Sequence, residues 1–192
     1  EVKYSNTLYI LGVEASKTTG IPALTWTKVD ADQMHGPGMK SELHPHGWSP
    51  RQGHTATRVG SYLYVFGGDS DDGLIRGDRI MRMKVLPDQE QFVLNQKLKY
   101  TWTILDALKG AAPAARHGHS AAFLSGRYYT LFGGFAGSKA TNEVFVLDLG
   151  AAGEKIGDNC KDTTGVEGDE CKWVQPTTTG SEPLPRQYAA AA

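Results

Sequence analysis

Three histidines in this chain could bind a metal. His44 and His46 are two residues apart, and His35 lies close by in the sequence. On an extended segment, this spacing would put both imidazoles on one side, as a shared ion requires. No Cys, Asp or Glu nearby completes a recognisable zinc pattern, so an exposed polar loop is the better interpretation.

Three aspartates suggest a calcium loop. Asp69, Asp71 and Asp72 precede Gly73, and calcium is bound by carboxylates grouped in a short loop. The acidic spacing is wrong, however, and Ile80 stands where a bidentate Glu would be needed. A solvated turn explains these residues better.

Two further motifs resemble catalytic or phosphate-binding sites. His117 and His119 lie beside Ser120, but no acid is placed to orient a histidine base. The segment 132–137 reads F-G-G-F-A-G and lacks the lysine and the following helix of a phosphate-binding loop. We therefore expect no catalytic residue, no metal and no cofactor in this chain.

The strongest signal is an internal repeat. Residues 51–68 read RQGHTATRVGSYLYVFGG, and residues 116–134 read RHGHSAAFLSGRYYTLFGG. Each copy has an Arg, a Gly-His pair, a small-residue strand, a short turn, an aromatic strand and a double glycine. Self-similarity at a long fixed period indicates a repeat architecture.

The sequence after the double glycine also repeats. Residues 78–84 correspond to 142–148 as a third strand, and a strand with a Trp follows at 100–105 and at 171–174. A four-stranded antiparallel unit repeated in tandem is typical of the blades of a β-propeller.

The N-terminal end carries a degenerate copy. Leu8–Gly12 would be the aromatic strand, with Val13 in place of the second glycine. Leu24–Val29 would be the Trp strand, and Pro50–Arg51 would close the unit.

The order of these motifs, G-H-[ST]-A, an aromatic strand ending in G-G and a Trp strand, resembles the kelch repeat. The resemblance covers nearly the whole chain and implies an all-β fold of kelch-type blades, each with four antiparallel strands. We expect the following division: a degenerate blade at 1–50, a blade at 51–115, a blade at 116–185 with an acidic Gly-rich insert at 150–170, and the start of a further blade at 186–192.

The number of blades is too small for a closed ring. Arg51 and Arg116 are 65 residues apart, and Arg116 and Arg186 are 70 apart, so the chain holds fewer than three complete blades. Propellers close with about four to eight blades. We expect an incomplete ring, with the remaining blades coming from the same or another chain.

The repeated motif residues have a physical role in such blades. A double glycine permits a sharp bend or a close backbone approach, and the Trp provides an apolar plate against the next blade. The Arg and His of each unit can bond backbone carbonyls where blades meet. We expect these residues to be structural: Arg51, His54, Gly67, Gly68, Trp102, Arg116, His119, Gly133, Gly134 and Trp173.

Cys160 and Cys171 are the only cysteines, and they flank the acidic insert. A disulfide could close that loop in an oxidising compartment, whereas a reducing cytosol would leave two free thiols. Free thiols are favoured here, because a large propeller does not need the added stabilisation of a disulfide.

The composition restricts the classes of function that this chain could have. The net charge is −1, with 20 basic and 21 acidic residues, which argues against nucleic acid as the main partner. No apolar run approaches the roughly 18 residues that span a membrane. The resemblance implies a non-catalytic protein-interaction scaffold, a subunit or adaptor of a larger assembly, located in the cytoplasm and associated with the cytoskeleton. The alternative is a kelch-type enzyme with a metal site in blades outside this chain.

The resemblance also places the binding loops on one face of the propeller. These loops follow each double glycine or precede each Arg, at 69–77, 135–141, 30–50 and 106–113. Aromatic residues and Arg dominate binding hot spots. The expected partner-binding residues are Trp48, Asp69, Asp71, Asp72, Arg76, Phe135 and Lys139.

Overall fold

Every regular element in the described part of the chain is a β-strand, which confirms the all-β fold class. The computed structural model describes residues 7–14, 23–29, 34–35, 50–70, 73–74, 79–84, 100–105, 108–150, 160 and 171–190. Among these residues, no helix is long and apolar enough to cross a membrane. The inserts at 36–49, 85–99 and 161–170 lie outside the described residues.

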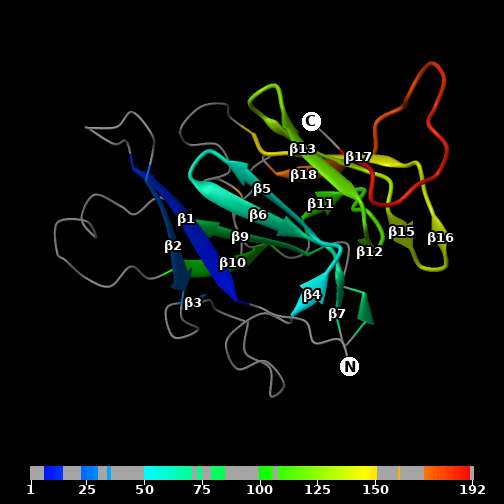
Figure 1. Cartoon of the computed structure of the whole chain (residues 1–192). Helices are drawn as coiled ribbons and strands as arrows, with labels where there is room; N and C mark the ends of the chain where they lie inside the picture. Colours follow the sequence, from blue (N-terminus) through cyan, green and yellow to red (C-terminus); the bar gives the residue numbers. More distant parts are fainter. Residues whose placement is uncertain are drawn as a thin grey trace.

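The middle blade is a four-stranded antiparallel meander (Figure 1). Its strands are β5 (Thr55–Val59), β6 (Tyr62–Phe66), β9 (Ile80–Lys84) and β10 (Tyr100–Leu105). A short strand from the preceding linker, β3 (Met34–His35), adds to β10 in parallel.

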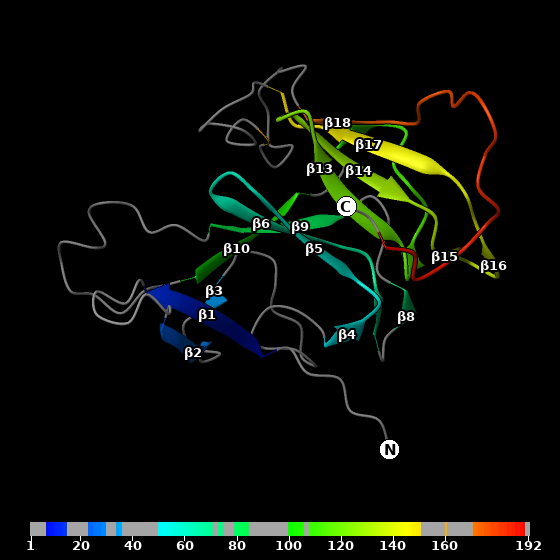
Figure 2. The ribbon, with the colours of Figure 1, turned by 45° about the horizontal axis from the view of Figure 1, so that its top comes forward.

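The last blade repeats this order strand for strand. Its strands are β13 (Ser120–Leu124), β14 (Tyr128–Phe132), β17 (Val144–Asp148) and β18 (Lys172–Val174). Here β11 (Lys109–Gly110) comes from the preceding linker and adds to β18 in parallel. Figure 2 shows the two blades stacked, with β5 beside β13.

Each blade also carries a small three-stranded sheet that sequence reasoning did not predict. One consists of β4 (Arg51–Gln52), β7 (Asp69–Ser70) and β8 (Gly73–Leu74). The other consists of β12 (Arg116–His117), β15 (Phe135–Ala136) and β16 (Lys139–Ala140). In each small sheet, the segment after the double glycine pairs with the two-residue strand that begins with the Arg of the same unit.

The N-terminal hairpin differs from the expectation. β1 (Leu8–Glu14) pairs directly with the Trp strand β2 (Ala23–Val29), with Leu11 opposite Trp26. In a complete blade, the strand beside the Trp strand is the third one. Assigning Leu8–Gly12 to the aromatic second strand was therefore wrong, because the short motif ending in Gly12 does not identify the strand that pairs with it.

The core lies between the blades. One face of the last blade carries Trp173, which is 1% exposed, and its ring meets that of Phe66 edge-on at 5.6 Å. Tyr129 on the same face lies 6.1 Å from Tyr64 of the middle blade. Trp102 is likewise 1% exposed, in a cluster against which Leu8 of the N-terminal hairpin packs. Trp102 and Trp173 thus each lie on the face of their blade that packs toward the preceding unit.

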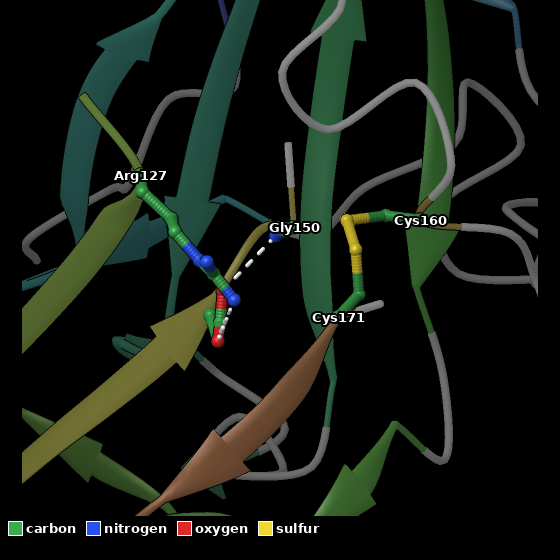
Figure 3. The surroundings of a disulfide bond; sticks show 5 residues. Arg127, Gly150, Cys160 and Cys171 are labelled. Carbon is green, nitrogen blue, oxygen red and sulfur yellow. Dashed lines mark hydrogen bonds and ion pairs between the residues drawn. A yellow bond between two sulfur atoms is a disulfide. The ribbon is translucent and has the colours of Figure 1, made fainter. Parts of the chain in front are cut away.

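The two cysteines are bonded, contrary to the favoured expectation of free thiols. Cys160 and Cys171 form a disulfide with a Cα–Cα distance of 5.3 Å, directly before β18 (Figure 3). Both side chains are buried in the core that contains Trp173. The expectation of free thiols considered only whether the blades need further stabilisation. The bond instead joins the two residues that flank the segment 161–170.

A second local clamp lies near this bond. Arg127, in the turn between β13 and β14, donates two hydrogen bonds of 2.6 and 2.7 Å to the carboxylate of Asp148 at the end of β17 (Figure 3). The amide of Gly150 donates to the same carboxylate. The Arg127 hydrogen bonds are the main reason why the pKa of Asp148 lies below its usual value.

Replacing both cysteines, as Cys160→Ser with Cys171→Ser, should lower the free energy of unfolding by about 2 to 4 kcal/mol, because the unfolded chain regains the entropy of the open loop. Urea denaturation of both proteins measures this loss. A thiol titration of the unfolded, unreduced wild type should find no free thiol, and two free thiols would contradict the bond.

Candidate functional site

Arg116 lies at the centre of the junction inside the last blade. The side chain is 1% exposed, and its guanidinium stacks over the ring of Phe145 at 5.0 Å. It donates hydrogen bonds to the carbonyls of Ala114 and Gly133, both at 3.0 Å, and to the carboxylate of Glu143 at 2.9 Å. The guanidinium thus satisfies two backbone carbonyls and one ion pair.

The equivalent arginines repeat parts of this pattern. Arg51 is buried and donates to the carbonyl of Gly67 at 3.3 Å, as Arg116 does to that of Gly133. Arg186 donates to the carbonyl of Leu184 at 2.9 Å, two residues earlier, as Arg116 does to Ala114.

The double glycines connect successive units through their backbones. Gly67 and Gly133 have left-handed φ angles of 63° and 68°. A Cβ on Gly67 would lie 2.5 Å from the carbonyl oxygen of Arg116, and one on Gly133 would lie 2.7 Å from that of Arg186. The amides of the second glycines, Gly68 and Gly134, donate to these same two carbonyls at 2.9 Å. A side chain at the first glycine would therefore push the next unit away.

His119 links the last blade to the middle blade. Its Nε2 lies 2.8 Å from the hydroxyl of Thr55 on β5, which also contacts the hydroxyl of Tyr129 at 3.2 Å. Burial lowers the pKa of His119 to about 3, and nearby Arg116 adds to this effect. Burial also lowers the pKa of His54, the equivalent residue of the middle blade. At neutral pH His119 is an uncharged hydrogen-bonding group, which is poorly suited to act as a base.

Around the small sheet of the last blade, three rings gather. His117 lies 5.5 Å from Phe135 and 6.4 Å from Tyr188, measured between ring centroids. Tyr188 is 64% exposed, and Lys139 at the tip of the β15–β16 hairpin is also exposed. We call Phe135, His117 and Tyr188 the aromatic patch. Lys139 pairs with Ala136 and therefore lies on the opposite face of the small sheet from Phe135.

Tyr188 was missed by sequence reasoning. It occupies the position that Gly53 and Gly118 hold in the other two units, and its φ of 55° is in the same left-handed region as theirs. Its amide donates to the carbonyl of Gly118 at 2.6 Å, just as the amide of Gly118 donates to Gly53 at 2.7 Å. Aligning Arg186-Gln187-Tyr188 with the two R-x-G motifs could have exposed this replacement.

The structure brings only some of the expected partner-binding residues together. Phe135 in β15 and Lys139 in β16 belong to one hairpin, and Asp69 lies in β7 of the other small sheet. The remaining four lie outside the described residues: Trp48, Asp71, Asp72 and Arg76. Their predicted role in binding stays a prediction.

The described residues contain no group of three or more His, Cys, Asp or Glu that could hold a metal ion. Of the three histidines considered for a metal, His44 and His46 lie outside that part, and only the backbone of His35 is described. At the junctions, Arg116 is hydrogen-bonded to two carbonyls and a carboxylate, and His119 is bonded through Nε2, while its buried Nδ1 has no hydrogen-bond partner among the described residues.

Comparisons with known proteins agree with the repeat. The family model described as the KLHDC2/KLHL20/DRC7 Kelch-repeats domain matches residues 1–192. Dynein regulatory complex subunit 7 of Chlamydomonas reinhardtii is 31% identical over 151 residues, 73% of this chain and 10% of that protein. Host cell factor 2 of Homo sapiens is 27% identical over 196 residues, 99% of this chain and 20% of that protein. Rho GTPase-activating protein gacHH of Dictyostelium discoideum is 30% identical over 148 residues, 76% of this chain and 8% of that protein. The chain thus spans a fifth or less of the length of these relatives.

Two substitutions at the Arg116 junction should lower the free energy of unfolding by clearly different amounts. Arg116→Met leaves the buried carbonyl of Gly133 without its donor and should lower the free energy of unfolding by about 2 to 4 kcal/mol. Glu143→Gln removes only an ion pair whose acid is 43% exposed, and should cost about 1 kcal/mol or less. Urea denaturation of both variants measures the difference. Equal losses of unfolding free energy in the two variants would mean that Arg116 stabilises the protein through the ion pair and not through its hydrogen bond to the Gly133 carbonyl.

Proposed function

Because the chain belongs to the kelch-repeat family, we propose that it is a non-catalytic scaffold that binds a protein partner through the loops of one propeller face. In this proposal it acts as a subunit or adaptor within a larger assembly, and the missing blades come from the same or another chain. The motif residues Arg51, Arg116, His54 and His119, with the double glycines and the buried tryptophans, hold the blades together and take no part in binding.

The observation that carries this proposal is the aromatic patch. Large aromatic side chains such as Tyr are among the residue types that dominate protein-interaction hot spots. Tyr188 is 64% exposed at a position where the two other units have glycine. Because a left-handed φ disfavours a side chain, Tyr188 costs stability that the fold itself does not require. A role in binding accounts for that cost.

The relatives support an assembly role and a location. One of them is named as a subunit of a dynein regulatory complex, and such a complex belongs to the cytoskeleton. We propose by this likeness that the present chain works in the cytoplasm in association with cytoskeletal structures. Its near-neutral charge suits a protein partner better than nucleic acid.

The second candidate, a metal-dependent enzyme with its site in blades outside this chain, makes a different prediction about composition. Elemental analysis of the whole purified protein would find stoichiometric copper or iron if that candidate is right. The scaffold proposal expects a protein partner in stoichiometric amount instead.

The double variant Tyr188→Gly with Lys139→Glu should weaken partner binding at least tenfold, since removing a hot-spot side chain costs about 2 kcal/mol or more. Glycine at 188 restores the residue type of the other units, so the circular dichroism and the unfolding midpoint should not fall. Affinity purification of the whole protein with quantitative mass spectrometry measures the loss of the partner.

Lys109→Glu is the matched control, because Lys109 is also an exposed lysine in a two-residue strand but lies in a different sheet. It should leave binding unchanged. If both proteins retain the same partners as the wild type, the aromatic patch is not the binding site.

A further inference from the structure

The linker after one unit forms the outer edge of the next unit. β11 (Lys109–Gly110) comes from the linker that follows the middle blade, yet it pairs in parallel with β18 of the last blade (Figure 1). β3 (Met34–His35), from the linker that follows the N-terminal hairpin, pairs in the same way with β10 of the middle blade. Each of these two Trp strands thus has a partner on its outer side that belongs to the preceding unit.

The register of this pairing is the same at both places. In β3, His35 lies opposite the residue that precedes Trp102. In β11, Lys109 lies opposite the residue that precedes Trp173. A strand at the edge of a sheet leaves a row of backbone groups unpaired, and a covering strand protects the sheet from unwanted pairing. The linker strand is therefore a regular part of the way in which successive units join.

Gly110 makes a close backbone contact at this join. Its φ of 95° is left-handed, and a Cβ on it would lie 1.9 Å from the carbonyl oxygen of Trp173. The amide of the next residue, Ala111, donates to that same carbonyl at 3.0 Å. Only glycine permits this approach, because the Cβ of any other residue would overlap the carbonyl.

The linker after the last blade carries the same sequence signal. Residues 109–116 read KGAAPAAR, and residues 179–186 read TGSEPLPR, so glycine, proline and arginine recur at the same spacing. The φ of Gly180 is 90°, close to that of Gly110. By this alignment, Thr179 and Gly180 correspond to β11.

Hydrogen bonds within the chain hold this second linker in shape. The hydroxyl of Thr178 donates to the carboxylate of Glu182 at 2.5 Å. The side-chain amide of Asn142 donates to the same carboxylate and to the carbonyl of Pro183, both at 3.2 Å. Gly180 lies between the residues that these bonds join, so its backbone conformation is fixed without a covering strand.

The two glycines differ in what lies against them. A Cβ on Gly110 would meet the backbone of Trp173, whereas within the described residues nothing lies within 4 Å of a Cβ on Gly180. The second linker thus has the sequence and the backbone of the first, and the place of the Trp strand beside it is open.

We propose that residues 178–181 are the docking site for the Trp strand of the next kelch unit, carried by the continuation of the same polypeptide. That strand pairs in parallel with Thr178 and Thr179, and its Trp lies opposite Gly180. The carbonyl of this Trp accepts a hydrogen bond from the amide of Ser181, as the carbonyl of Trp173 does from the residue after Gly110.

The residues after the linker support a strand from the same polypeptide. The amide of Gly134 donates to the carbonyl of Arg186 at 2.9 Å, and the amide of Tyr188 donates to the carbonyl of Gly118 at 2.6 Å. Arg116 and Gly118 make the same contacts with the middle blade where the last blade begins. In both earlier cases the linker and the Trp strand that it covers lie in one polypeptide.

This inference deepens the proposed scaffold function, because it states how the next blade is attached. It involves residues outside the aromatic patch, and its test does not use the binding partner. A failure of the docking site would therefore leave the proposed binding site untouched, and the reverse also holds.

Hydrogen exchange of the whole purified protein tests the proposal at one amide. The amide of Ser181 should exchange as slowly as that of Ala111, because both would donate to the carbonyl of a Trp. This protection should not change on dilution, since the strand belongs to the same polypeptide. Exchange of Ser181 at the rate of an open loop would overturn the proposal. Protection that is lost on dilution would also overturn it and would assign the strand to another molecule.

Three matched Gly→Ala variants of the whole protein give a second test. Gly73, Gly110 and Gly180 have φ angles of 99°, 95° and 90°, so alanine brings similar backbone strain at all three. Gly73 is the control, because nothing lies within 4 Å of a Cβ on it. Gly180→Ala should lower the urea midpoint of unfolding as far as Gly110→Ala does, and further than Gly73→Ala. Equal midpoints for Gly180→Ala and Gly73→Ala would mean that no strand pairs with this linker.

Discussion

The whole structure depends on one backbone contact at the end of each aromatic strand. The chain leaves β6 and β14 through two left-handed glycines, and the amide of the second glycine donates to the carbonyl of the arginine that opens the next unit. This hydrogen bond is possible only because the first glycine has no side chain at the point of closest approach. The bond fixes where the next unit begins and hence where the first strand of that unit lies.

The polar motif residues offset the cost of burying backbone polar groups where the two units approach closely. Arg116 reaches back to the carbonyl of Gly133 in its own unit, and His119 bonds Thr55 of the preceding blade. Buried carbonyls without a donor are costly, so these side chains satisfy the junction while the tryptophans exclude water from it. A histidine whose pKa lies near 3 is fixed as a neutral group and remains one across physiological pH. His119, one of the residues that suggest chemistry in the sequence, thus links the two blades through Thr55.

The repeated motifs made the blades predictable, since each strand carried its own pattern and the two copies supported one another. Features outside the repeated strands were harder to predict from the sequence. The two-residue strands of the small sheets, such as β7 and β15, are too short to show any periodicity. The pairing of β1 depends on its partner strand, which the short motif ending in Gly12 could not identify. Cys160 lies outside the repeated motifs, so no pattern in the sequence could indicate its bond to Cys171. Phe135 and Lys139 were expected from their loop to bind a partner, and this stays a prediction. The exposed Tyr188 could be noticed only by comparing the three R-x-G positions.

Hydrogen exchange at the amides of Gly68 and Gly134 is the most direct test of the account, because these two groups carry the contact between successive units. Both residues lie outside regular strands, and loop amides ordinarily exchange fast. If the contact organises the fold, both amides should be protected as strongly as the amides in the middle of β6 and β14. Exchange of these two amides at the rate of an open loop, while β6 and β14 stay protected, would contradict the claim that these two hydrogen bonds organise the fold.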